Sequence, residues 1–365
     1  MKFKNRALVK RFKSFIGAIT PKDRVAVIHH TDPDGVCSGV IISKVVERVR
    51  GKKIDLRINQ YHAAHRILDE TITQLKKKKI NKVITTDLAT DEDPANIRKL
   101  AKFADILIID HHPVLHKFPL KNVIVIKSKL ISNKSPYCAS KMCYDLGSLV
   151  ADVSDLDWLA VVGSIGDIAT GPWKRWVSSV FKKYKVKMKK NLFDTKFGEI
   201  SKILSSAETF SHKNVKECFT VLYSAKNYKS MLKSRLGRFK KKIDAELNHY
   251  IKNLRNLAHV DGDLIYYEIK PKYNVKSPLS TILGLKYPSK TVFIVDITKN
   301  PVRISARSQK VKVKVNKILI SSMKGIKDAY GGGHAVSSGA IVPKKDYKKF
   351  KECLFKSLQK KEVKK

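Results

Sequence analysis

The chain has 365 residues, of which 43% are hydrophobic, so two ordinary folded domains are expected and global disorder is excluded. Lysine and arginine number 75 against 32 acidic residues, and the net charge of +43 favours a polyanionic partner, most simply nucleic acid. A proteome that is basic throughout would give the same surplus, and this alternative stays open. No stretch has the roughly 18 uninterrupted apolar residues of a membrane span, so we expect a soluble, cytoplasmic protein with no membrane partner. The five cysteines form no Cys-x-x-Cys pair, so structural zinc is not expected.

The first chemical feature is a short turn rich in acids and imidazoles. The apolar run 25–28 predicts a buried strand, and apolar residues recur at helical spacing from 36 to 49. Two carboxylates only two residues apart repel each other unless a cation lies between them. A solvated Asx turn is the plain alternative, because aspartate is common before proline or glycine. The chemistry-bearing residues of the turn are His29, His30, Asp32 and Asp34.

Two later strands end on similar residues. The β-branched run 82–86 leads to Asp87, and the run 105–109 leads to Asp110, His111 and His112. A further candidate, Asp167, follows an apolar segment. Because the ligand site of an open α/β sheet lies outside the carboxyl ends of its strands, we expect these side chains to converge. Oxygen-rich sites with some imidazole suit manganese or magnesium better than zinc, and two such metals can clamp a phosphoryl group and activate water.

An acidic run, residues 91–93, precedes Pro94 and could also supply metal ligands. We interpret it instead as the start of a helix, because acids in a first helical turn need no further explanation.

The alternation of strands and helices between residues 20 and 170 predicts an α/β fold with a mostly parallel sheet and helices on both faces. After residue 173 the pattern becomes helical and basic, and from about residue 259 strands return. We therefore expect four parts: a catalytic domain at 1–173, a basic helical connector at 174–258, a smaller α/β domain at 259–345, and a C-terminal helix with a Lys-rich tail at 346–365.

These residues together resemble a known family. The segment 30–35, Asp87, the Asp-His-His at 110–112 and Asp167 are similar to the four ordered motifs of the DHH phosphoesterases. Near the C-terminus, Gly331-Gly332-Gly333-His334 and the basic strand 302–308 resemble the DHH-associated substrate domain. The resemblance runs from about residue 25 to about residue 342 in family order, and its nearest branch is RecJ-like.

The resemblance implies roles for the motif residues. His30, Asp32 and Asp87 would hold one metal, and Asp34, Asp87, His111 and Asp167 would hold a second, with Asp87 bridging both. The cofactor would be two Mn²⁺ ions, with Mg²⁺ as the alternative. His29 could compete with His30, but strand alternation points the two rings to opposite sides. Asp110 would orient an imidazole, and His112 would face the scissile phosphate as a hydrogen-bond donor or proton source.

For the C-terminal domain the resemblance implies a substrate clamp with a glycine run that lets backbone amides approach an anion. The family usually has small apolar residues a few positions later, where this chain has Ser337 and Ser338, and this departure puts the preferred substrate in doubt. The clamp residues would be Arg303, Ser305, Arg307, Gly331, Gly332, Gly333 and His334.

The resulting expectation is a metal-dependent phosphodiesterase that hydrolyses single-stranded DNA or RNA, or short oligonucleotides, as a RecJ-like exonuclease. A nanoRNase or phosphoadenosine phosphatase and a cyclic-dinucleotide phosphodiesterase are alternatives within the enzyme class. A non-catalytic replication scaffold is the alternative from another class, although such a protein should lack several metal ligands. A homodimer and replication or repair partners are further expectations that the sequence leaves open.

Overall fold

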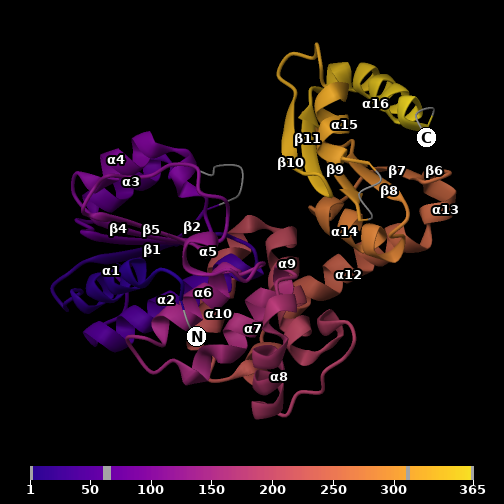
Figure 1. Cartoon of the computed structure of the whole chain (residues 1–365). Helices are drawn as coiled ribbons and strands as arrows, with labels where there is room; N and C mark the ends of the chain where they lie inside the picture. The colour runs from indigo at the N-terminus through magenta and orange to yellow at the C-terminus, as the bar shows by residue number, and fades with distance from the viewer. Residues whose placement is uncertain (1–2, 61–66, 310–312, 363–365) are drawn as a thin grey trace. The chain divides into compact units, whose positions relative to one another are not determined.

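The computed structural model describes residues 3–60, 67–309 and 313–362. The chain divides into two compact units, Met1–Lys240 and Lys241–Lys365 (Figure 1). Within the described ranges, no helix combines the length and the apolar character that crossing a membrane requires.

A five-stranded parallel sheet lies at the centre of the first unit, with the order β2-β1-β3-β4-β5. Val, Ile and Leu fill most positions of its central strands, as expected for a parallel sheet that is covered on both faces. The strands are β1 (Val25–His29), β2 (Leu56–Asn59), β3 (Lys82–Thr86), β4 (Asp105–Asp110) and β5 (Val123–Lys127).

Helices cover both faces of this sheet, so the α/β prediction is confirmed. Val25 and Val27 of β1 belong to the apolar cluster built on α1 and α2, whereas Ala26 and Ile28 belong to the cluster built on α3 and α4. The helices of the first unit are α1 (Arg6–Gly17), α2 (Pro33–Arg50), α3 (Asp69–Lys77), α4 (Pro94–Ala101), α5 (Ser128–Ile131), α6 (Ala139–Gly147), α7 (Asp157–Gly166), α8 (Lys174–Lys183), α9 (Lys196–Phe210), α10 (Val215–Ser224) and α11 (Tyr228–Leu232).

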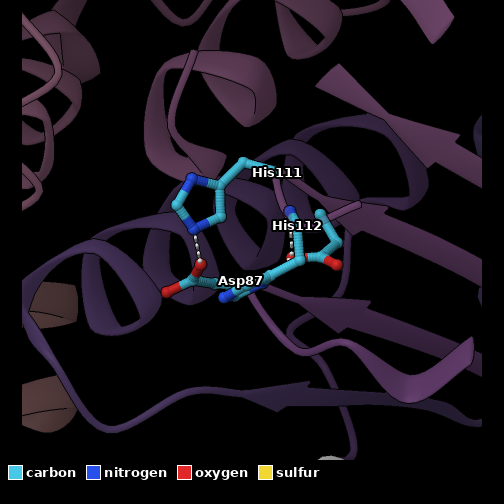
Figure 2. Close-up of side chains that lie close together, drawn as sticks. Asp87, His111 and His112 are labelled. Atoms are coloured by element: carbon cyan, nitrogen blue, oxygen red, sulfur yellow. Dashed lines mark hydrogen bonds and ion pairs between the residues drawn. The ribbon is translucent and has the colours of Figure 1, made fainter. Parts of the chain in front are cut away.

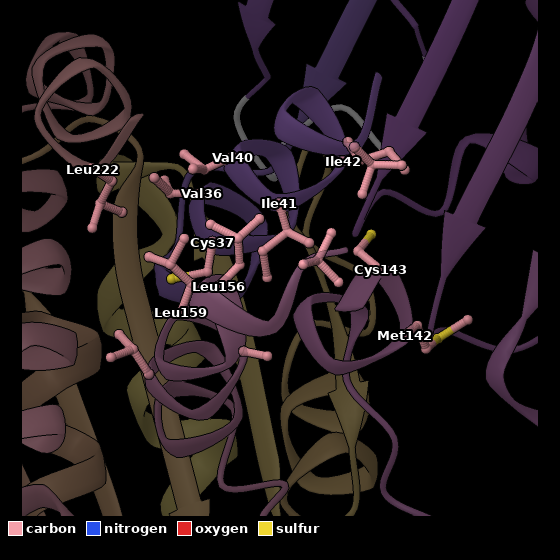
Figure 3. Packing of buried hydrophobic residues seen from close by; sticks show 14 of the residues in the cluster. Val36, Cys37, Val40, Ile41, Ile42, Met142, Cys143, Leu156, Leu159 and Leu222 are labelled. Carbon is pink, nitrogen blue, oxygen red and sulfur yellow. The ribbon is translucent and has the colours of Figure 1, made fainter. Parts of the chain in front are cut away.

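Helix α2 directly follows the turn that carries the first motif. Asp32 caps it by accepting a hydrogen bond from the Gly35 amide at 2.8 Å, Pro33 takes the first helical position, and Gly51 ends the helix with a φ of 71°. The apolar side chains of α2 pack among α6, α7 and α10, which holds the start of the helix firmly against the sheet (Figure 3).

The segment 174–240, expected to belong to a connector, packs into the first unit instead. Val177, Phe181, Phe197 and Phe239 are buried in the same cluster as α2, because the apolar faces of α8 to α11 turn inwards and leave their lysines outside. Helix α12 (Gly237–Lys252) then crosses the boundary into the second unit.

In the described part of the second unit, the strands form a six-stranded sheet with the order β10-β11-β9-β8-β7-β6, and β7 and β8 are its one parallel pair. Helices α15 and α16 belong to the cluster on one face, and α14 contacts β8 and β9. The strands are β6 (His259–Asp261), β7 (Leu264–Ile269), β8 (Thr291–Asp296), β9 (Val302–Ser308), β10 (Tyr330–His334) and β11 (Ser337–Val342), and the helices are α13 (Leu254–Leu257), α14 (Lys276–Lys286), α15 (Val315–Ser322) and α16 (Tyr347–Glu362). The Lys-rich end expected at 363–365 lies outside the described residues.

Candidate metal centre

Parallel pairing places the motif residues at one level of the sheet. His29 of β1 pairs with Thr86 of β3, and Thr86 pairs with Ile109 of β4, so the residues that follow each of them leave the sheet side by side. Asp87 adopts a φ of 59°, a left-handed conformation that aspartate tolerates better than most residues. The carboxyl edge of the sheet therefore carries His30, Asp87 and Asp110.

The first candidate ligand group joins β1, the α2 cap and β3. His30 Nδ1 lies 3.1 Å from Asp32 Oδ1 and 3.5 Å from Asp87 Oδ2. One ligand atom from each of these three residues lies within 4.8 Å of the other two, which is close enough for one metal ion to bind all three.

The second group uses the other oxygen of Asp87. His111 Nε2 lies 3.2 Å from Asp87 Oδ1 (Figure 2), and His111 Nδ1 lies 3.4 Å from Asp167 Oδ2. Asp34 belongs to the same group and accepts hydrogen bonds from the backbone amides of Ala139 and Ser140 at the start of α6. Asp167 reaches the site from the C-terminal end of α7. The structure thus brings together all six residues that the resemblance assigned to metal binding.

The electrostatics of the group fit bound cations. Burial and the neighbouring Asp87 raise the pKa of Asp34 to about 7, and burial and Asp34 raise the pKa of Asp167 to about 8. Burial alone would lower the pKa of His111, but Asp87 and Asp167 outweigh it and raise that pKa well above its ordinary value. Carboxylates crowded in this way repel until a cation neutralises them, and a donor set of carboxylate oxygens and imidazole nitrogens suits Mn²⁺ or Mg²⁺.

His29 has a different environment from His30. Its ring is fully buried, stacks on Phe219 at a centroid distance of 5.2 Å, and has Nδ1 2.6 Å from the carbonyl oxygen of His30. Burial and the nearby Arg57 lower the pKa of His29 to about 3. His29 therefore faces the packed side of the strand, and His30 alone of the two faces the carboxylates.

Asp110 and His112 stand beside the ligand groups. Nδ1 of His112 lies 2.7 Å from Asp110 Oδ1, and the His112 side chain is 28% exposed. Asp110 is fully buried, and hydrogen bonding to His112 together with the charge of Lys127 holds its pKa below the usual range in spite of that burial. Asp110 thus orients His112.

Two residues at this site, Lys127 and Glu208, were missed in the sequence. Lys127 contacts both Asp110 and Asp91, and Glu208 of α9 accepts a hydrogen bond from Thr31 at 2.5 Å. Within the acidic run 91–93, Asp93 caps helix α4 by accepting a hydrogen bond from the Asn96 amide, as the sequence predicted for a helix start. Asp91 instead pairs with Lys127. Lys127 could have been noticed in the sequence, because it is a charged residue at the end of the otherwise apolar strand β5. No local pattern marked Glu208.

The predicted clamp residues all lie in the second unit. Arg303, Ser305 and Arg307 alternate along β9, where Arg307 Nη2 lies 3.4 Å from Ser277 Oγ and Ser305 Oγ lies 3.1 Å from Ser280 Oγ. Gly331, Gly332, Gly333 and His334 form the edge strand β10, which pairs with β11.

Lys276, at the start of α14, is a further basic residue next to this strand. Its amino group lies 3.4 Å from the Ile304 carbonyl oxygen, and burial together with Arg307 and Arg303 lowers its pKa to about 8. No carboxylate forms an ion pair with Lys276, Arg303 or Arg307 among the described residues. The face of β9 next to α14 therefore carries positive charge that an anion could neutralise.

Comparisons with known proteins agree with this geometry. Residues 24–159 match the DHH family, N-terminal domain. An uncharacterized protein of Methanocaldococcus jannaschii, MJ0831, is 29% identical over 153 residues, which cover 40% of this chain and 34% of the relative, so the aligned part spans about a third of that protein.

Two solved structures share the fold over nearly the whole chain. One is RecJ of Thermus thermophilus in complex with Mn²⁺, with a TM-score of 0.73 and 15% identity, covering 97% of this chain and 55% of that one. The other is exonuclease RecJ bound to manganese, with a TM-score of 0.67 and 15% identity, covering 95% of this chain and 93% of that one.

The matched segment and the gathered candidate ligands place residues 24–159 in the class of domains that the DHH family N-terminal domain defines. Within that class, this chain has a RecJ-like fold, in which a second α/β unit follows the first. The resemblance to the DHH family that the sequence motifs indicated is confirmed over residues 24–159.

Proposed function

We propose that this protein is a metal-dependent phosphodiesterase that hydrolyses single-stranded nucleic acid or short oligonucleotides. The observation that carries the proposal is the position of Asp87, whose two oxygens face two separate ligand groups, 3.5 Å from His30 and 3.2 Å from His111. One carboxylate that faces two candidate metal positions suits two-metal phosphoryl chemistry, in which two ions stabilise the attacking and leaving oxygens.

Each residue of the site has a definite task in this proposal. His30, Asp32 and Asp87 would hold one divalent cation, and Asp34, Asp87, His111 and Asp167 would hold a second. Bound cations would supply positive charge to the phosphate and lower the pKa of water. His112 donates a hydrogen bond from Nε2 to a phosphoryl oxygen or provides the proton for the leaving oxygen. Asp110 keeps the ring in place by accepting the Nδ1 hydrogen. The amides at the start of α6 hold Asp34 in the orientation that ligation needs.

The basic character of the chain supports an oligonucleotide substrate over a small ester. The net charge of +43 greatly exceeds what one phosphate would need, and the face of β9 with Lys276, Arg303 and Arg307 offers a further anion position. The presence of all six metal-binding residues argues against a non-catalytic scaffold. A replication or repair association remains part of the proposal as a source of single strands.

The test is to offer the purified protein with Mn²⁺ a panel of labelled single-stranded DNA, single-stranded RNA, dinucleotides, a cyclic dinucleotide and pyrophosphate. We expect hydrolysis of single strands that stops when a chelator is added and is absent in the Asp87→Asn variant. Hydrolysis of dinucleotides alone would favour the nanoRNase alternative. Hydrolysis of pyrophosphate together with no hydrolysis of any oligonucleotide would refute the proposal.

A further inference from the structure

A row of buried charges runs from the protein interior to His112. Asp91 Oδ1 lies 2.6 Å from Lys127 Nζ, Lys127 Nζ lies 2.5 Å from Asp110 Oδ2, and Asp110 Oδ1 lies 2.7 Å from His112 Nδ1. Asp91, Lys127 and Asp110 are all 0% exposed, and only His112 reaches the surface of the site.

The sheet explains how these groups meet. Asp110 and Lys127 are direct partners in the parallel register of β4 and β5, so both leave the carboxyl edge at the same level. Asp91 comes from a 3₁₀ turn, Thr90–Glu92, that follows Asp87 by three residues. The lysine therefore lies between two carboxylates that come from different strand ends, and it neutralises part of their charge.

Asp91 also holds the loop that follows His112. Its second oxygen, Oδ2, accepts a hydrogen bond from the Leu115 amide at 2.9 Å, and its carbonyl oxygen lies 2.8 Å from His116 Nδ1. Both the ring of His112 and the chain beyond it are thus fixed to the same buried group of charges.

Folding alone does not require this arrangement. Burying three charges removes each of them from water, and well-packed apolar side chains of similar volume are often as stabilising as a buried ion pair. The specific effect of Lys127 is geometric: it occupies Asp110 Oδ2, so that Oδ1 is left to accept the Nδ1 hydrogen of His112.

We infer that Lys127 and Asp91 are positioning residues that fix the tautomer and orientation of His112 for phosphodiester hydrolysis, an inference that rests on the proposed function. With Nδ1 donating to Asp110, Nε2 is left to act on the substrate in one defined protonation state. Lys127 acts on Asp110, and Asp91 acts on Lys127 and on the loop, so neither needs to touch the substrate.

The decisive variant is the double substitution Lys127→Met with Asp91→Asn. A single Lys127→Met change would leave two buried carboxylates without their cation and could prevent folding, whereas the double change removes one positive and one negative charge together. The matched control is Arg50→Met with Asp55→Asn. That pair is also largely buried, 2.9 Å apart, and its Asp55 binds the Val25 amide at the opposite edge of the same sheet.

Two readouts separate positioning from stability. The first is kcat and KM on a labelled single-stranded oligonucleotide with saturating Mn²⁺, where we expect the double variant to lose about tenfold or more in kcat with little change in KM, as for other groups that orient a reacting residue. The second is the ¹H–¹⁵N spectrum of the histidine rings in chelator-treated protein. We expect the wild type to show His112 protonated at Nδ1 and the double variant to show a mixture of tautomers.

Thermal unfolding monitors both double variants, and the control should lose stability without losing kcat. Equal kcat losses in the two double variants, or a His112 ring spectrum unchanged by Lys127→Met with Asp91→Asn, would overturn the inference. The ring spectrum does not depend on turnover, so it decides the positioning role even if the wild-type protein hydrolyses none of the proposed substrates.

Discussion

Oδ1 of Asp87 lies 3.2 Å from Nε2 of His111, and this contact joins the ends of two neighbouring strands (Figure 2). Asp87 directly follows β3 and His111 follows β4, so their distance is set by the sheet and does not depend on a flexible loop. The site is therefore pre-organised at its centre, where the shared carboxylate lies.

Replacing Asp87 by asparagine should remove activity while the fold is kept. The change keeps the shape of the side chain but removes the charge that both ligand groups share, so we expect kcat with Mn²⁺ to fall by more than about 100-fold. Calorimetric titration should show weaker Mn²⁺ binding. Asp155→Asn is the control, because Asp155 is 62% exposed and pairs with Arg48. More than about a tenth of wild-type activity in the Asp87 variant would contradict the two-metal assignment.

Gly35→Ala should disturb the first ligand group. A Cβ at Gly35 would come within 2.7 Å of the His30 backbone, so the start of α2 or the His30 turn must shift. Although alanine is the better helix former, we expect the overpacked variant to lose about 1–3 kcal/mol of unfolding free energy. Denaturant unfolding and Mn²⁺ titration both report the change.

Gly17→Ala is the matched control for this substitution, because a Cβ at Gly17, also in a helix, meets nothing within 4 Å. If Gly35→Ala were as stable as the Gly17 variant and bound Mn²⁺ normally, the close approach of α2 to His30 would have no energetic role.

The stability of chelator-treated protein should fall as the pH rises. Folding raises the pKa of Asp34 to about 7 and that of Asp167 to about 8. The protonated carboxyl groups therefore stabilise the folded state. This stabilisation is fully present below the unfolded pKa of each group and is lost as the pH rises through the raised pKa. The raised pKa values of His30 and His111 act in the same direction. Asp32, with a lowered pKa, contributes oppositely, but its contribution is lost only at acid pH.

We therefore expect Tm to decrease between about pH 6 and 9 without metal, and Mn²⁺ to restore it most at the upper end because the ligands bind metal when deprotonated. The Asp34→Asn, Asp167→Asn double variant should flatten the metal-free profile. A Tm that rises with pH over this window in the wild type would contradict the proposed crowding of carboxylates.

Arg307→Ala should separate substrate capture from chemistry. Arg307 lies on β9 in the second unit beside Ser277 and the half-buried Lys276. Loss of one phosphate contact should lower kcat/KM for an oligonucleotide by about tenfold and leave bis-p-nitrophenyl phosphate nearly unchanged, because only the long substrate uses remote contacts.

The control for Arg307 is Arg255→Ala, an exposed arginine of the same unit on α13. Equal damage to the small ester and the oligonucleotide in the Arg307 variant would show that the arginine serves folding or the catalytic step, and not capture of the strand.

Most strands of the first sheet could be predicted from local sequence patterns, and so could the gathering of the candidate metal ligands at one edge of that sheet. Short runs rich in β-branched residues lead to Asp87 and to Asp110. Neighbouring parallel strands bring such ends to the same edge of a sheet, and this does not depend on the loops between them. The choice of His30 over His29 also followed locally, because adjacent strand residues point to opposite faces.

The buried partners of the candidate site residues depend on the packing of the whole first unit. A helix start explains Asp91 locally, but its ion pair with Lys127, 36 residues later, depends on the pairing of β4 with β5 in a definite register. Thr31 meets Glu208 across 177 residues for a similar reason: α9 packs beside α2 and α7 in the first unit. Local patterns report which face of an element is apolar, whereas the neighbours of each element, and so the partners of each buried charge, depend on how the elements pack in the folded chain.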